Sequence, residues 1–163
     1  MAIVGFHHVA FSSPDLDRLE RFYVSLFRFE RVFDFVWEKG SEAIDRILGL
    51  EGSAGRAVML RTGNSFIEIF EFSSPAPKRR DGDRPVHDHG LTHICIAVDD
   101  AAAECARLEK LGLRLHCPAV EMGPFTGTYG RDPDGNVIEI LAVADNDFPL
   151  HFSNRRLAAL RGA

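Results

Sequence analysis

The sequence predicts an α+β fold built from two tandem βαβββ modules. The first observation is an internal repeat: GFHHVAFSSPDL at 5–16 aligns with GLTHICIAVDDA at 90–101, and GNSFIEIF at 63–70 aligns with GNVIEILA at 135–142. The second is that, in each copy, apolar residues recur at every second position except in one segment, where their spacing is that of a helix. A repeat of about 70 residues that occurs twice indicates a duplicated module, since solenoid repeats are shorter.

The first module is expected to span residues 5–73. Residues 6–12 alternate as in a strand, and Ser13-Pro14-Asp15 then signals a helix start, with proline in the first turn and acidic residues nearby. An apolar stripe continues that helix from Leu16 to Phe27. Three further strands are predicted, at 29–37, 57–61 and 65–72, the last two joined by a turn at Thr62-Gly63-Asn64.

The second module is expected to span residues 90–143 and to repeat this order. A strand at 91–98 precedes a helix at 100–111. The remaining strands are predicted at 113–117, 125–130 and 136–143, with a tight turn at Asp132-Pro133-Asp134-Gly135 before the last of them.

Three segments lie outside the repeat. Residues 38–56 form an insertion with a short helix at 42–48, which we expect to act as a lid. Residues 74–89, rich in proline and charge, are typical of a linker. The tail at 144–163 is predicted to end in a short helix that begins at Ser153, an N-cap residue type.

The composition predicts a single globular domain across the 163 residues. A content of 45% hydrophobic and 26% charged residues excludes global disorder. The apolar runs are too short for a membrane span of about 20 residues, and no signal peptide is visible. A net charge of −5 with scattered basic residues argues against a nucleic-acid partner. The cysteines are expected to be buried thiols of a cytoplasmic protein: Cys95, Cys105 and Cys117.

The same two residue types recur at equivalent places in the two modules. His8 and His93 fall in the first predicted strands, and Glu68 and Glu139 fall in the last. A carboxylate within an apolar strand needs a cation or a hydrogen-bonding partner, because burying a lone charge is costly. Two imidazoles and two carboxylates on one face would hold a divalent metal such as Zn, Ni, Co, Mn or Fe. His7 is predicted to point to the opposite face and to be solvated or to support the site from outside.

This order of His, Glu, His and Glu over paired modules resembles the vicinal oxygen chelate superfamily. That superfamily includes glyoxalase I, methylmalonyl-CoA epimerase, extradiol dioxygenases and antibiotic-resistance proteins. The resemblance covers residues 5–143, and its most specific segments are HHVAFSSPDLDRLERFY, GNSFIEIFE, LTHICIAVDD and YGRDPDGNVIEIL. It implies a curled, mostly antiparallel eight-stranded sheet around one divalent metal per site. The implied metal ligands are His8, Glu68, His93 and Glu139, in a homodimer that binds a small-molecule substrate.

The branches of the superfamily differ at these positions. The complete ligand set is that of glyoxalase I, whereas extradiol dioxygenases use two histidines and one carboxylate, and drug-sequestering resistance proteins usually lack the set. Methylmalonyl-CoA epimerases often have Gln where this chain has Glu68. Bacterial glyoxalases I tend to have an Arg and an Asn that bind glutathione where this chain has Ser12 and Phe72. These two residues argue against glutathione as a substrate.

The resemblance implies a metal-dependent lyase or isomerase of the glyoxalase I type, which stabilises an enediolate or enolate on a small 2-oxo or thioester substrate. Such chemistry needs a base that takes and returns a proton, and we expect Glu139 in this role, with Glu68 second. The insertion offers Glu42, Asp45 and Glu51 as further bases. The alternatives left open are an acyl-CoA epimerase, for which Glu51 is the candidate base, a ring-cleaving dioxygenase and a non-catalytic small-molecule binding protein.

Overall fold

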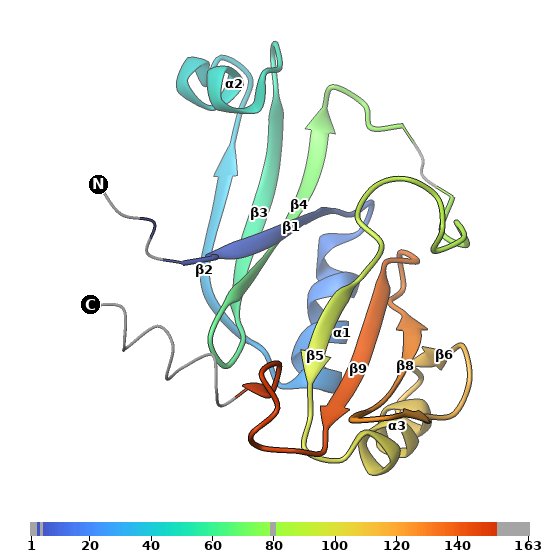
Figure 1. The fold of residues 1–163 in the computed structure, drawn as a ribbon. Helices are drawn as coiled ribbons and strands as arrows, with labels where there is room; N and C mark the ends of the chain where they lie inside the picture. Colours follow the sequence, from blue (N-terminus) through green and yellow to red (C-terminus); the bar gives the residue numbers. More distant parts are fainter. Residues whose placement is uncertain (1–2, 4, 79–80, 153–163) are drawn as a thin grey trace. The chain divides into compact units, whose positions relative to one another are not determined.

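The computed structural model describes residues 3, 5–78 and 81–152, and it confirms the α+β class (Figure 1). The chain divides into two compact units, Met1–Asp81 and Gly82–Ala163. Each unit has its own mixed sheet, one of four strands and one of five. The paired βαβββ modules predicted from the repeat are therefore present, one in each unit.

The first unit contains β1 (His8–Ser12), α1 (Leu16–Phe27), β2 (Glu30–Trp37), α2 (Glu42–Leu48), β3 (Ala54–Arg61) and β4 (Phe66–Ser74). Its sheet has the order β1-β4-β3-β2, in which β1 is parallel to β4 and the other neighbours are antiparallel. The predicted insertion is confirmed as a helix, α2, that lies beyond the ends of β2 and β3 (Figure 1).

Helix α1 covers one face of this sheet. It begins where the carboxylate of Asp15 accepts a hydrogen bond from the Arg18 backbone N–H, and its buried residues include Leu16, Leu19, Tyr23 and Leu26. The Leu16 N–H donates to Glu71 of β4 at 2.8 Å. Glu71 shares its face of β4 with the buried Ile67 and Ile69, because side chains alternate along a strand. Glu68 therefore lies on the face that α1 leaves uncovered.

The second unit contains β5 (Ile94–Ala97), α3 (Ala101–Lys110), β6 (Arg114–Leu115), β7 (Val120–Met122), β8 (Phe125–Arg131) and β9 (Val137–Val143). Its sheet has the order β5-β9-β8-β6, with β7 also paired to β8, and β5 is parallel to β9. Within the described residues, the two sheets therefore have nine strands and not the predicted eight. The additional strand, β7, consists of three exposed residues, which is too short for an alternating pattern to reveal.

The hairpin turn before β9 is confirmed, and it anchors the segment that leads to β5. The Asp132 carboxylate accepts the backbone N–H groups of Asp134 and Asn136 at 2.9 and 2.8 Å. Gly135 has φ 83°, and a Cβ there would lie 1.9 Å from the Gly82 carbonyl oxygen, so only glycine fits. Arg131 donates to the carbonyl oxygens of Gly82 and Arg84. From Gly82 onward, the predicted linker is therefore packed against the second unit.

Two other predictions have different outcomes. Cys105 is buried as expected, but Cys95 and Cys117 are exposed. Cys95 is exposed because it is aligned with Glu139 on the sheet face opposite the one on which α3 packs. The helix predicted from Ser153 lies outside the described residues. Within the described residues, no helix is long and apolar enough to span a membrane.

Candidate metal centre

The first unit brings His8 and Glu68 together. Because β1 is parallel to β4 and His8 is aligned with Phe66, His8 lies on the same face as Glu68, which is two residues further along. The distance between His8 Nε2 and Glu68 Oε2 is 3.4 Å. The Glu68 side chain is the more buried of the two, at 14% exposure against 37% for His8.

The second unit repeats this arrangement. The distance between His93 Nε2 and Glu139 Oε2 is 3.1 Å. His93 directly precedes β5 and does not lie within it, which corrects the predicted strand boundary. The parallel register of β5 and β9 nevertheless continues far enough to place His93 diagonally across from Glu139, as His8 is from Glu68.

The geometry of each pair fits two neighbouring ligands of one ion. Metal–nitrogen and metal–oxygen bonds of about 2.1 Å, at angles between about 90° and 109°, put the two ligand atoms about 3.0–3.4 Å apart. The two observed distances fall within this range. Neither unit by itself gathers three or more His, Cys, Asp or Glu side chains among the described residues. Protein zinc sites use three or four such ligands, so one pair alone does not complete a site.

The Glu68 carboxylate is largely buried, with 14% of its side chain exposed. Burial raises the pKa of Glu68, and the neighbouring His8 and His7 act in the opposite direction. A raised pKa means that the protein surroundings disfavour the ionised form of Glu68, because the sheet replaces water around the carboxylate. A bound divalent cation would reverse this balance and hold Glu68 in its ionised form.

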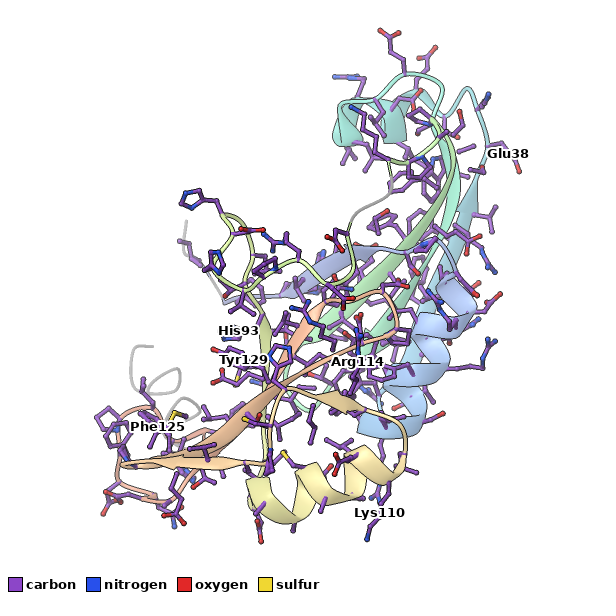
Figure 2. The ribbon with its side chains drawn as sticks, turned by 90° about the vertical axis from the view of Figure 1, so that its right-hand side faces the viewer. Glu38, His93, Lys110, Arg114, Phe125 and Tyr129 are labelled. Atoms are coloured by element: carbon purple, nitrogen blue, oxygen red, sulfur yellow. The ribbon has the colours of Figure 1, made fainter. Side chains whose placement is uncertain are left out.

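Tyr129 is a neighbour of the second pair that the sequence analysis did not identify. It lies opposite Glu139 in the register of β8 and β9, and its ring centroid is 4.9 Å from that of His93 (Figure 2). Burial, and to a lesser extent the charge of Glu139, raise the pKa of the Tyr129 phenol. The phenol therefore remains a hydrogen-bond donor at neutral pH, close to the base expected from the sequence.

His116 is a second neighbour that the sequence analysis missed. Its ring centroid is 6.2 Å from that of Tyr129, and burial together with Arg131 and Arg114 lowers its pKa. The lowered pKa favours the neutral form of this imidazole. Neither residue has a counterpart in the repeated segments, so only the fold reveals their positions.

The first pair has aromatic neighbours instead. Phe70 and Phe72 follow Glu68 at two-residue steps on the same face of β4, and both lie against Trp37 of β2, with ring centroids 6.1 and 5.5 Å away. Gly55 of β3 makes room for this indole, since a Cβ there would lie 2.7 Å from a Trp37 ring carbon. Phe72, which stands where bacterial glyoxalases I tend to have an Asn, is therefore part of an aromatic cluster.

The acidic residues of the insertion have a structural environment. The Asp45 carboxylate accepts the backbone N–H groups of Gly52 and Ser53, both at 2.9 Å, and hydrogen bonds from Ser53 lower its pKa. Glu42, Asp45 and Glu51 line a shallow pocket around α2. Asp45 thus holds the loop that follows α2, and its hydrogen bonds make it a poor base.

Comparisons with known proteins agree with this fold. A family model described as "Glyoxalase/Bleomycin resistance protein/Dioxygenase superfamily" matches residues 5–140. A 2-epi-5-epi-valiolone epimerase from Actinomyces sp. is 31% identical, over 85% of this chain and 79% of that protein. A lactoylglutathione lyase from Schizosaccharomyces pombe is 22% identical over 96% of this chain, which spans about half (53%) of that protein's length. Among solved structures, a glyoxalase family protein from Bacillus cereus aligns with a TM-score of 0.76 at 22% identity, covering 89% of this chain and 97% of that one.

Proposed function

Because this chain belongs to the glyoxalase/bleomycin resistance protein/dioxygenase superfamily, we propose that it is a metal-dependent isomerase or lyase of a small carbonyl compound. The proposed ligands of one divalent ion are His8, Glu68, His93 and Glu139. The observation that supports this is the recurrence of a His–Glu pair, at 3.4 and 3.1 Å, in the same position of each module. Two pairs together supply the four ligands that neither unit has alone.

The ion would supply Lewis-acid stabilisation of negative charge on the oxygen atoms of the substrate. Glu139 takes the proton from the carbon beside the carbonyl group and returns it. Glu139 is preferred over Glu68 because its cross-strand neighbours, Tyr129 and Cys95, carry polar groups. The cross-strand neighbours of Glu68, Ala10 and Met59, have no side-chain hydrogen-bond donor.

Among reactions that begin with proton removal, isomerisation is the one we favour. The Actinomyces relative, at 31% identity, is named as an epimerase. Ser12 and Phe72 stand where bacterial glyoxalases I tend to have an Arg and an Asn that bind glutathione. We therefore propose that the proton returns to the same or a neighbouring carbon of a substrate other than a glutathione adduct.

The test is exchange of substrate hydrogen with solvent deuterium, measured by NMR on a panel of 2-oxo, cyclic ketone and acyl-CoA compounds. Replacing a general base typically slows turnover by about 10²–10⁴-fold, so Glu139→Gln should abolish detectable exchange while the protein stays folded. Glu109→Gln, at an exposed position of α3, is the matched control and should exchange like the parent protein.

Two results would contradict the proposal. Unchanged exchange in Glu139→Gln would show that another residue is the base. Oxygen uptake with catechols would favour a ring-cleaving dioxygenase instead. Ligand binding without hydrogen exchange, with the same affinity in Glu139→Gln, would favour a non-catalytic binding protein. We also propose a homodimer, which sedimentation equilibrium would establish or exclude.

A further inference from the structure

The residue before each proposed histidine ligand contacts the ring nitrogen that faces away from the carboxylate. In the first unit, His7 Nδ1 lies 2.8 Å from His8 Nδ1. In the second unit, Thr92 Oγ1 lies 3.0 Å from His93 Nδ1. His7 and Thr92 occupy equivalent places in the repeat, yet they are chemically different residues. The two modules thus make the same contact with different side chains.

We propose that His7 and Thr92 are positioning residues that accept a hydrogen bond from the Nδ1–H of His8 and His93, and so keep each Nε2 lone pair available for a metal ion. This inference rests on the proposed metal site. A neutral imidazole has one N–H, and the hydrogen bond made by one nitrogen determines whether the other can act as a ligand. In the metal-free protein, Glu68 and Glu139 compete for that proton at Nε2, so the Nδ1 partner sets the tautomer ratio.

Each positioning residue is itself held in place. The ring of His7 stacks on Phe66 of β4, with centroids 4.9 Å apart and planes 21° apart. The His7 carbonyl oxygen accepts hydrogen bonds from the Phe66 N–H and the Ser65 hydroxyl. His7 can therefore present Nδ1 to His8 as an acceptor when its own proton is on Nε2.

The segment before Thr92 is fixed by a different residue. Arg84 donates to the carbonyl oxygens of Asp88, His89 and Leu91, at 3.1, 3.0 and 2.9 Å. These bonds hold the chain up to the residue that precedes Thr92. The Thr92 hydroxyl can both donate and accept a hydrogen bond. The experiment must therefore establish that it accepts from the Nδ1–H of His93.

The test is the proton position on the rings of His8 and His93 in the metal-free protein. Long-range ¹H–¹⁵N correlation spectra report it directly. Thr92→Val keeps the shape of the side chain and removes the acceptor, and His7→Phe keeps a ring to stack on Phe66. Each variant should lower the Nδ1-protonated fraction of the following histidine only. Thr92→Ser and His7→Asn, which restore an acceptor, should recover the parent ratio.

Zinc affinity, measured by competition with a chromophoric chelator, is the second readout. Loss of such a supporting hydrogen bond typically weakens metal binding about 10–100-fold, and the rescue variants should regain most of that loss. His87→Ala, which removes a histidine with an 83% exposed side chain, is the control and should change neither readout.

The outcomes separate this inference from the proposed function. If Thr92→Val and His7→Phe leave the tautomers and zinc affinity unchanged, or raise the Nδ1-protonated fraction, the positioning role is wrong even where zinc binds. If the tautomers shift as expected and are rescued while the parent protein binds no divalent metal, the positioning role stands and the metal proposal fails.

Discussion

The acidity of Tyr129 depends in part on a neighbour across the sheet. Its phenol lies opposite Glu139 in the register of β8 and β9, and its ring lies against His93. Burial and the Glu139 charge both disfavour the tyrosinate, so its pKa is raised. Any change in the charge of Glu139 should therefore be visible at Tyr129.

We expect Tyr129 to remain protonated at pH values where a free tyrosine has ionised, above about pH 10. In Glu139→Gln the pKa of Tyr129 should fall but stay above its ordinary value, since burial is the larger cause. NMR titration of ¹³C-labelled tyrosine measures this, with Tyr23 as an internal reference in the other unit. A pKa for Tyr129 that is unaffected by Glu139→Gln would show that the two side chains do not interact.

The sequence could identify single residues only where a pattern recurs. His8, Glu68, His93 and Glu139 were found because the same types stand at the same places in both modules, and the structure pairs them within each unit. Tyr129 and His116 were missed because their positions depend on cross-strand register, which no local pattern encodes. Strand alternation predicts that His7 and His8 face opposite ways, but β1 begins at His8, and Nδ1 of His7 lies 2.8 Å from Nδ1 of His8.

At the scale of elements, the loop after α2 is tied to the aromatic face of the first sheet. Ser53 is fully buried and accepts a hydrogen bond from the Trp37 indole N–H at 3.0 Å, while its own N–H donates to Asp45. These bonds join α2, the loop and the end of β2. These hydrogen bonds therefore fix the end of the insertion to the first unit.

Ser53→Ala should leave the Trp37 N–H buried without a partner. An unsatisfied buried donor costs about 1–3 kcal/mol, so the free energy of unfolding should fall by about that amount. Urea unfolding followed by the fluorescence of the chain's single tryptophan measures the change. Ser73→Ala, at an exposed position of β4, is the matched control. Equal stability of the two variants would mean that the Trp37–Ser53 bond contributes nothing.

Elements were predictable where local signals agreed. Helix α1 has a full apolar stripe, a capping aspartate and a proline before it, and the predicted bounds match the observed ones. Proline and charge predict a linker at 74–89, but Gly82 and Arg84 within it are held in the second unit by Arg131 and by the close approach of Gly82 to Gly135. Such contacts join residues some 50 positions apart and leave no trace in local composition.

At the scale of the whole molecule, the central question is whether the two His–Glu pairs bind one metal ion or act separately. Each unit supplies one imidazole and one carboxylate, and two such ligands fall short of the three or four that hold a zinc ion in proteins. If the pairs act together on one ion, removing a ligand from either unit must affect the same ion. If they act separately, each unit must bind its own ion without regard to the other.

The most direct test is the metal content, by elemental analysis, of the parent protein, Glu68→Gln, Glu139→Gln and the control Glu109→Gln after dialysis against a dilute divalent metal. We expect one ion per chain in the parent and control, and loss of that ion in both ligand variants. Two ions per chain with one retained in each ligand variant, or one ion unaffected by either change, would contradict the account.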